Sequence, residues 1–204
     1  MKRAIKQDDI RLEVLVDYDY ALRHGNDIIL KGNGTVLPML RRQTTGYQCL
    51  SDYYDESQKQ LLAWFTIVCE PRQQAANEEE KLMLHAICAR LAEACAEWLQ
   101  RQLYNDTHVL RVAFGYATCP DHSLKRIVFD LLDAERRLGI TLTDHYSIQP
   151  STAICGLFVC HPEARYFPVG RIDQTQLADY CQRRGISIAK GEELLSKYLT
   201  KENI

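Results

Sequence analysis

The chain has 204 residues, 46% of them hydrophobic and 25% charged, and a formal net charge of −2 at pH 7. This length suits one large domain or two small ones and allows a substantial core. The near-neutral charge, with both signs mixed along the chain, argues against a nucleic-acid surface and a polybasic membrane patch. The sequence contains no long apolar run and no signal-like apolar segment after its basic start, so we expect a cytoplasmic protein without a transmembrane helix.

Three strands are predicted in the first third of the chain. Residues 11–20 alternate between apolar and polar side chains, and residues 26–36 contain a Gly-Asn-Gly turn. Residues 60–69 form an apolar run with polar flanks, which is typical of a buried strand.

The longest helix is predicted over residues 77–103. Asn77 can cap its N-terminus, and Glu80 stands three residues later, in the spacing of a capping box. Apolar residues then recur with the period of a helix. We expect five of them to form a stripe buried against the sheet: Leu84, Cys88, Leu91, Cys95 and Leu99.

The second half of the chain mixes helices with further strands. Asp121 is a good N-cap for a helix that Gly139 ends, and residues 152–160 and 165–172 are predicted to form a hairpin around the sequence HPEA. Two short helices follow at residues 173–185 and 187–199. Strands and helices that do not strictly alternate predict an α+β fold with a mainly antiparallel sheet, in one domain over residues 1–204.

The eight cysteines do not form a recognisable disulfide or metal pattern. Most of them lie inside apolar runs, where free cysteine behaves as a small core residue, and no Cys-x-x-Cys pair occurs. Cys119 and His122 have a zinc-like spacing that Cys160 and His161 could complete, but neither half is a paired ligand motif. We therefore expect reduced thiols and no metal site.

Three further kinds of site have weak support. Ser123 next to His122 lacks a nucleophile elbow, and neighbours in the first turn of a helix point in different directions. Glu93 and Glu97 lie one helical turn apart, opposite the apolar stripe, which is typical of a solvated face. Glycine-rich nucleotide motifs are absent. We expect neither a hydrolase nor a nucleotide-binding site.

The sequence RVAFGYATCPDHSLK at residues 111–125 is the remaining candidate, although an arginine, a glycine and a tyrosine before a helix are common by themselves. Arg111 offers a planar fork of donors for a carboxylate or phosphate. Gly115 lets the backbone approach a ligand or turn sharply, and Tyr116 supplies a flat face and a hydroxyl. Together these residues would suit a zwitterion with a carboxylate at one end and a flat or cationic group at the other.

Five segments follow one another in a recognisable order: LAEACAEWLQ, RVAFGYATCPDHSLK, LLDAERRLGITLT, HPEARYFPVGRI and LADYCQRRGIS. They resemble the activation domain of cobalamin-dependent methionine synthase, as a free-standing chain. The resemblance is dense over residues 81–199 and thinner over the sequences MLRRQT, CLSDYYD and LLAWFTIV. The resemblance gives no place to the strands expected in residues 1–35.

The resemblance implies a C-shaped α+β domain in which helices flank a twisted antiparallel sheet. It also implies binding of S-adenosylmethionine during reductive reactivation, when an electron from flavodoxin and a methyl group from S-adenosylmethionine restore methylcobalamin. The chain lacks the family's cobalamin-ligating Asp-x-His-x-x-Gly signature. Cobalamin would therefore be reached only through a partner, either the cobalamin domain of a separate methionine synthase or another corrinoid protein, with flavodoxin as a further candidate partner.

The resemblance gives six candidate residues for binding S-adenosylmethionine: Arg111, Ala113, Gly115, Tyr116, Tyr166 and Phe167. Arg111 would hold the methionine carboxylate, the backbone near Ala113 would contact the adenine or ribose, and Tyr116 would line the pocket. No residue is expected to be catalytic, because the chain would be an accessory module of a methyltransferase without a complete active site.

Two departures from the family pattern leave a second hypothesis open. Ala117 stands where the motif has proline, and the family's N-terminal Asp-Trp-Thr-Pro segment, which supplies an acidic ligand, has no counterpart here. The first hypothesis is a module that binds S-adenosylmethionine and supports remethylation of cobalamin on a separate protein. The second is a non-catalytic docking module that keeps the fold and has lost ligand binding.

Overall fold

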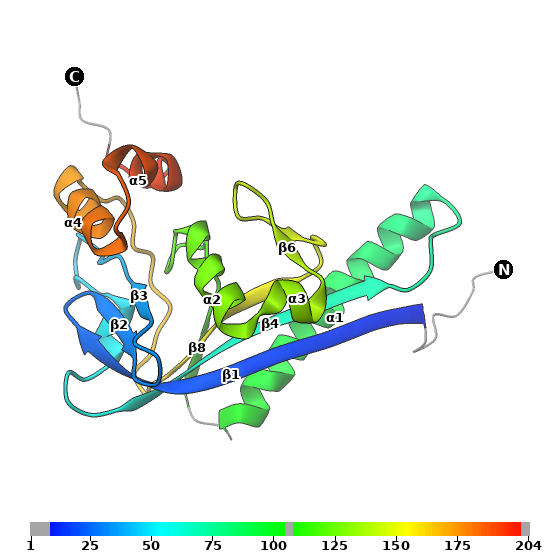
Figure 1. The fold of residues 1–204 in the computed structure, drawn as a ribbon, viewed down its shortest axis with the longest axis horizontal. Helices are drawn as coiled ribbons and strands as arrows, with labels where there is room; N and C mark the ends of the chain where they lie inside the picture. Colours follow the sequence, from blue (N-terminus) through cyan, green and yellow to red (C-terminus); the bar gives the residue numbers. More distant parts are fainter. Residues whose placement is uncertain (1–8, 105–107, 201–204) are drawn as a thin grey trace. The chain divides into compact units, whose positions relative to one another are not determined.

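The computed structural model describes residues 9–104 and 108–200 and contains a six-stranded sheet in the order β3-β2-β1-β4-β8-β5 (Figure 1). Its strands are β1 (Ile10–His24), β2 (Asp27–Leu30), β3 (Val36–Pro38), β4 (Gln60–Pro71), β5 (Val109–Val112) and β8 (Ile154–Cys160). The pairs β1–β2, β2–β3 and β5–β8 are antiparallel, as is a small separate sheet of β6 (Thr141–Leu142) and β7 (Ile148–Gln149). The predicted α+β fold with a mainly antiparallel sheet is confirmed. Of the N-terminal stretch, residues 1–8 lie outside the described residues.

Five α-helices are present in the described residues: α1 (Glu78–Tyr104), α2 (Lys125–Leu132), α3 (Ala134–Leu138), α4 (Gln174–Arg184) and α5 (Ile188–Leu195). The predicted cap of α1 is confirmed, because the Asn77 side chain accepts a hydrogen bond from the Glu80 backbone amide at 2.8 Å. Gly139 and Gly185 end α3 and α4 with φ angles of 66° and 64°, as glycines at helix ends commonly do. Among the described helices, none is both long and apolar enough to cross a membrane.

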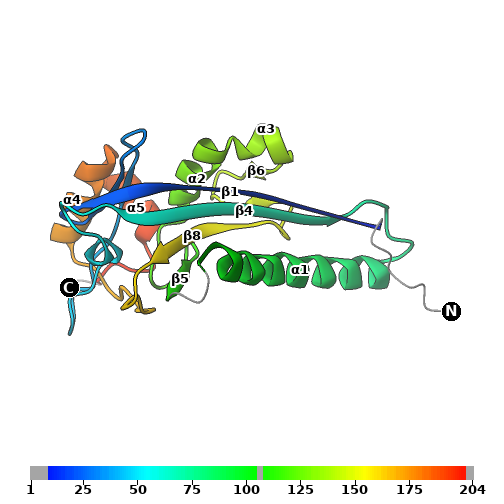
Figure 2. The same cartoon turned by 90° about the horizontal axis from the view of Figure 1, so that it is seen from below.

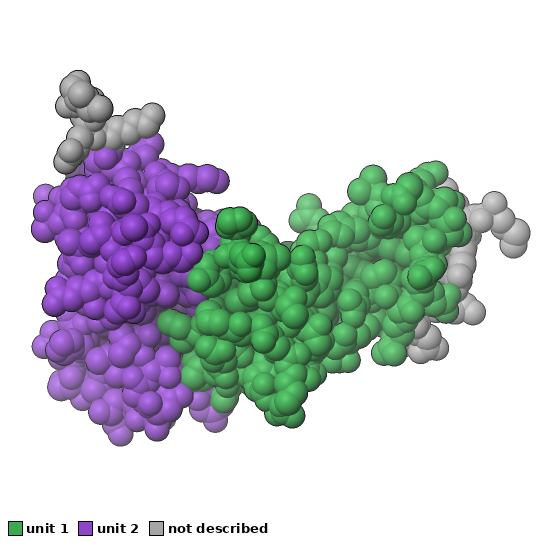
Figure 3. All heavy atoms as spheres, turned by 45° about the horizontal axis from the view of Figure 1, so that its top comes forward, with its two compact units in different colours: residues 1–17, 64–105, 125–156 green, residues 18–63, 106–124, 157–204 purple. Residues whose placement is uncertain are grey.

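The chain divides into two compact units (Figure 3). Unit 1 consists of residues 1–17, 64–105 and 125–156, and unit 2 consists of residues 18–63, 106–124 and 157–204. In unit 1, α1 lies on one face of the strands, and α2 and α3 lie on the opposite face (Figures 1 and 2). Strands β1, β4 and β8 contribute residues to both units. The single domain expected from the sequence stays a prediction.

The buried stripe of α1 differs in part from the prediction. Three of the five expected residues are buried: Leu84, Cys88 and Leu99. Leu91, however, is 37% exposed and Cys95 is half-buried, whereas Ala92 and Ala96 are fully buried. Small alanine side chains allow a helix to pack closely, and sequence patterns select the larger apolar residues instead. The face that α1 buries is therefore rotated away from Leu91.

The helix predicted from Asp121 to Gly139 is divided into three pieces. A short 3-10 turn, η3 (His122–Leu124), comes first and is followed by α2 and α3. Asp133, between the last two, has a φ of 51°, which a right-handed helix does not allow. The prediction of one continuous helix is therefore wrong.

The hairpin predicted after β8 is also wrong. Residues 161–171 form no strand, and Ile172 makes only an isolated bridge to Leu199. Pro162 and Pro168 interrupt this segment, and proline has no amide hydrogen to donate to a sheet ladder. The segment is therefore an irregular connection.

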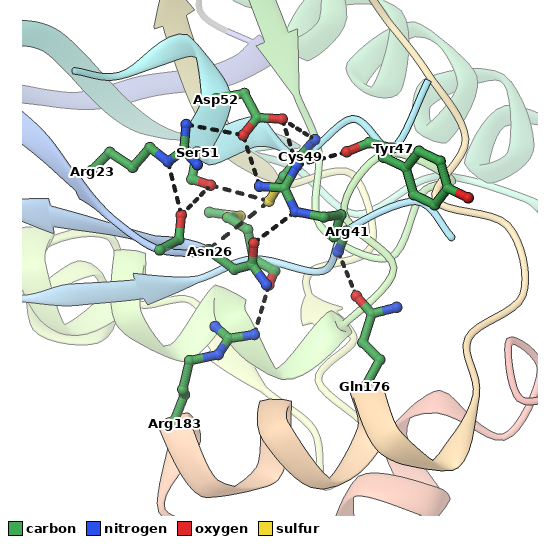
Figure 4. A network of polar contacts seen from close by, with 11 residues as sticks. Arg23, Asn26, Arg41, Tyr47, Cys49, Ser51, Asp52, Gln176 and Arg183 are labelled. Carbon is green, nitrogen blue, oxygen red and sulfur yellow. Dashed lines mark hydrogen bonds and ion pairs between the residues drawn. The ribbon is translucent and has the colours of Figure 1, made fainter. Parts of the chain in front are cut away.

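A polar network holds the loop between β3 and the 3-10 turn η2 (Leu50–Tyr53) in unit 2 (Figure 4). Arg41 forms a two-pronged ion pair with Asp52, at 2.8 and 2.7 Å, and donates further hydrogen bonds to Asn26 Oδ1 and Tyr47 O. Its backbone amide donates to the side chain of Gln176 on α4 at 2.6 Å. Because these donors are used within the fold, we assign a structural role to this network.

All eight cysteines are free thiols, and most of them are buried. Burial raises the pKa of Cys69 and of Cys155 to about 12, and it raises the pKa of Cys119 well above its ordinary value. A thiol that is protonated reacts slowly, since the thiolate is the nucleophile.

We therefore expect the native protein to react slowly with a thiol reagent at about pH 8, while the denatured protein yields eight thiols rapidly.

Burial raises the pKa of these cysteines in the folded state, so the stability of the fold should depend on pH. The stabilisation that the buried, protonated thiols contribute is fully present below the unfolded pKa of about 8.5 and is lost as the pH rises toward the folded pKa. Urea unfolding between about pH 7 and about pH 10 should show a falling free energy of unfolding. Fewer than eight thiols in denaturant would contradict the prediction of reduced cysteines.

Candidate functional site

Arg111 lies on β5 within unit 2. It stands opposite Phe158 of β8 in the antiparallel register, and it is half-buried. Neighbouring side chains on a strand point to opposite faces, and Val112, the next residue, is buried on the other face of β5 from Arg111. The base of the Arg111 side chain is therefore held by a sheet strand and not by a loop.

The chain turns back immediately after β5. The Gly115 amide donates to Cys119 O at 2.7 Å, and the Cys119 amide donates to Tyr116 O at 2.9 Å. Gly115 has a φ of +88°, and a Cβ atom there would lie 1.9, 2.2 and 2.3 Å from Cε1, Nδ1 and Nε2 of His122. Glycine meets both conditions, so the turn and the His122 ring fit closely together. Tyr116 is 63% exposed, and its ring projects from the turn.

A second segment of unit 2, which follows the His-Pro step, is hydrogen-bonded to this turn. Thr118 Oγ1 donates to Phe167 O at 2.7 Å, and the Val169 amide donates to Ala117 O at 2.8 Å. Phe167 and Val169 are buried, whereas Tyr166 is 57% exposed. The two hydrogen bonds thus place the backbone of the predicted aromatic pair directly beside the turn.

A buried charged cluster lies just after the turn. Asp121 accepts hydrogen bonds from the Ser123 amide at 2.7 Å and the Tyr180 hydroxyl at 2.8 Å, and it forms an ion pair with Arg184. Burial, followed by the charge of Asp121, raises the pKa of Tyr180 well above its ordinary value, so the hydroxyl remains a donor. Tyr180 and Arg184 belong to α4, and the cluster therefore fixes η3, with the His122 ring, to that helix.

The family model for the vitamin B12-dependent methionine synthase activation domain matches residues 1–109 and 106–185. The chain belongs to this family of activation domains. A crystal structure of the MetH reactivation domain bound to AdoHcy is similar to it, with a TM-score of 0.87 and 25% sequence identity over 96% of this chain and 73% of the relative. The family resemblance indicated by the sequence motifs is confirmed, and the fold is that of a reactivation domain.

The activation-domain motif lies on one stretch of the chain that runs from β5 through the turn: Arg111, Ala113, Gly115 and Tyr116. Ala113 is half-buried where the strand ends. Tyr166, on the neighbouring segment, presents its ring to solvent, but the ring of Phe167 is buried in the core. The structure brings these two segments together, and a common ligand site for the six residues stays a prediction.

The side chains that the sequence offered as weaker candidates, Ser123 and Glu97, have structural partners in this activation domain. Ser123 Oγ donates to Asp121 at 2.6 Å and accepts a hydrogen bond from Arg184 at 2.7 Å, so the hydroxyl is part of the buried cluster. Glu97 is exposed and pairs with Arg101 one turn along α1, as expected for a solvated face. Among the residues that the structure describes, no group of three or more metal-ligating side chains is placed to hold an ion.

Sequence reasoning missed several residues that shape the turn of the activation domain. Thr118 bonds to a carbonyl 49 residues away, and nothing in its local sequence indicates that partner. Asp121 was recognised only as a helix cap, because its contact with α4 depends on the tertiary fold. The sequence offers His122 as a candidate metal ligand or base, whereas its ring occupies the space beside Gly115.

Proposed function

We propose that this activation domain binds S-adenosylmethionine at the turn after β5 and supports the reductive remethylation of cobalamin held by another protein. The observation that carries the proposal is the pair of hydrogen bonds joining the turn to the segment of Tyr166. The similar reactivation domain is described as bound to AdoHcy, which is the product that remains after S-adenosylmethionine loses its methyl group. The shared fold and motif support the same class of ligand for this chain.

Arg111 is the proposed contact for the amino-acid end of the ligand. Its guanidinium is always charged, and its planar fork matches the two oxygens of a carboxylate. The side chain is half-buried, which strengthens such an ion pair relative to one in bulk water. We assign Arg111 to the methionine carboxylate.

Tyr116 and Tyr166 are the proposed contacts for the flat and cationic parts of the ligand. Both rings are exposed, and an aromatic face can stack on adenine or attract the positive sulfonium group. Gly115 lets the chain turn sharply after β5, with the His122 ring filling the space beside it, and the turn carries Tyr116 close to the backbone of Ala113. The guanidinium of Arg111 and the two tyrosine rings thus offer one suitable contact each for the carboxylate, the adenine and the sulfonium of S-adenosylmethionine.

The chain's own contribution would be to bind and orient the ligand and to exclude water around it. S-adenosylmethionine supplies the methyl group when bound, and a separate reductant, for which flavodoxin is the candidate, supplies the electron. The sequence contains no Asp-x-His-x-x-Gly signature, so we propose the cobalamin domain of methionine synthase or another corrinoid protein as the partner.

Equilibrium calorimetry with S-adenosylmethionine and S-adenosylhomocysteine tests this function. Arg111→Ala should weaken binding about ten- to a hundredfold, because a hydrogen bond to a charged group contributes about 1.5–3 kcal/mol. Tyr116→Phe should weaken it less, since the ring is kept and only the hydroxyl is lost.

Arg136→Ala is the matched control, because it removes an equal charge from an exposed side chain that pairs with Asp133 on the surface of unit 1. It should leave the affinity unchanged. Thermal unfolding of each variant would show whether the half-buried Arg111 also affects stability. Folded wild-type protein that gives no heat with either ligand at millimolar concentration would contradict the proposal and favour the non-catalytic docking module.

A further inference from the structure

Helix α1 carries a second apolar stripe outside the face that it buries. Met83 is 48% exposed and Trp98 is 59% exposed, and Leu91 and Ala94 are exposed between them. At 3.6 residues per turn these positions, with the half-buried Ile87, fall within an arc of about 100° on the helix surface. Among the helices and strands that the structure describes in unit 1, none lies on the outer side of α1 in Figure 2. A continuous apolar stripe of this kind on a surface helix marks an interaction site.

The residues of the stripe are arranged almost symmetrically about the middle of the helix. Its centre lies between Arg90 and Leu91, which correspond to each other, and three further pairs of positions equally far from that centre are complementary. These pairs are Met83 with Trp98, Ile87 with Ala94, and Glu80 with Arg101. In two of these pairs both residues are apolar and can pack on each other, and in the third an acidic residue is matched with a basic one.

We propose that α1 is a homodimerisation helix, which pairs antiparallel with α1 of a second copy of this chain. In such a pair, related by a two-fold axis, every contact occurs twice. Met83 of each copy packs on Trp98 of the other, and Ile87 packs on Ala94. Glu80 in the first turn lies opposite Arg101 in the last turn of the second copy, so opposite charges close the seam at both ends.

The charges along α1 favour a second copy in this orientation. Three acidic residues occupy the first turn, and Arg101 is the basic residue of the last turn. Antiparallel helices bring these unlike ends together and also oppose their dipoles favourably. The present ion pair of Arg101 with Glu97 is exposed on both sides, so the guanidinium can also reach an acidic group of a neighbouring copy.

The length of the seam sets the expected strength. The stretch from Glu80 to Arg101 spans about 31 Å at 1.5 Å per residue. One helix from each copy gives an interface at the small end of the range for specific complexes, and we expect dissociation constants on the order of micromolar. This inference does not depend on the proposed ligand, because the seam lies wholly on α1.

Sedimentation equilibrium of the whole chain, from about 1 to about 500 µM, tests the proposal. We expect a reversible monomer–dimer equilibrium. Trp98→Glu should raise the dissociation constant roughly 30-fold or more, because it places a charge at the largest aromatic contact of the seam, which occurs twice in the dimer. Met83→Glu should act in the same direction. The matched control is Leu82→Glu, which changes another exposed apolar residue of α1 that lies off the stripe and should leave the equilibrium unchanged.

A cross-linking experiment tests the register. Leu91→Cys places a thiol next to the two-fold axis, so mild oxidation should yield a covalent dimer, whereas Leu82→Cys should not. Circular dichroism would confirm that each variant keeps its helices. A chain that stays monomeric at every concentration overturns the proposal, and so does Leu82→Glu weakening the dimer as much as Trp98→Glu. Covalent dimer from Leu82→Cys but not from Leu91→Cys overturns the antiparallel register.

Discussion

Gly115→Ala should lower the free energy of unfolding by about 2–6 kcal/mol, with a marked loss of ligand affinity. One part of this effect is strain, because alanine at a φ of +88° is unfavourable by about 1–3 kcal/mol. The other part is steric, since the new Cβ would lie within 2.3 Å of three atoms of the His122 ring. Affinity should fall because Tyr116 is carried by the same turn. Chemical denaturation and calorimetry measure the two effects.

A double-mutant cycle separates the steric part from the strain. His122→Ala removes the ring that the new Cβ would meet, so the variant with both changes should recover about 1–3 kcal/mol relative to Gly115→Ala alone. The strain at Gly115 should remain in the double variant. If the double variant is no more stable than Gly115→Ala, the His122 ring does not restrict this position.

Asp121→Ala should be the most destabilising change in the cluster after the turn. It leaves the buried Tyr180 and the half-buried Arg184 without the carboxylate that both contact, and removal of one partner from a buried ion pair costs about 3–5 kcal/mol. For a chain of this size the thermal midpoint should fall by roughly 6–20 °C. Differential scanning calorimetry measures this shift.

A matched control uses an exposed ion pair of the same unit. Glu193→Ala removes a carboxylate that pairs with Lys190 on the surface of α5, and its effect should stay below about 1 kcal/mol. A comparable loss of stability in both variants would mean that the Asp121 pair is not protected from solvent. The ligand affinity of Asp121→Ala, measured below its midpoint, should also fall, because the cluster holds η3 and His122 in place.

Much of the secondary structure was predictable because its causes are local. The cap at Asn77, the glycine stops at Gly139 and Gly185, and the alternation in β1 each depend on residues within about one turn or one strand. The motif around Arg111 was equally visible, and it was sufficient to indicate the family. By contrast, the position of the segment after β8 depends on hydrogen bonds to the turn after β5, which lies far away in the sequence.

The sequence by itself determined the bounds of β4, α1 and α4 closely, which family the chain belongs to, and which residues are candidates for ligand contact. Only the tertiary structure decided which face of α1 is buried, because close packing selects Ala92 and Ala96 over the larger Leu91. It also decided that Phe167 faces the core while Tyr166 stays exposed. Periodicity and capping act over a few residues, whereas hydrogen bonds such as that of Thr118 join segments far apart in the chain, and no local pattern specifies them.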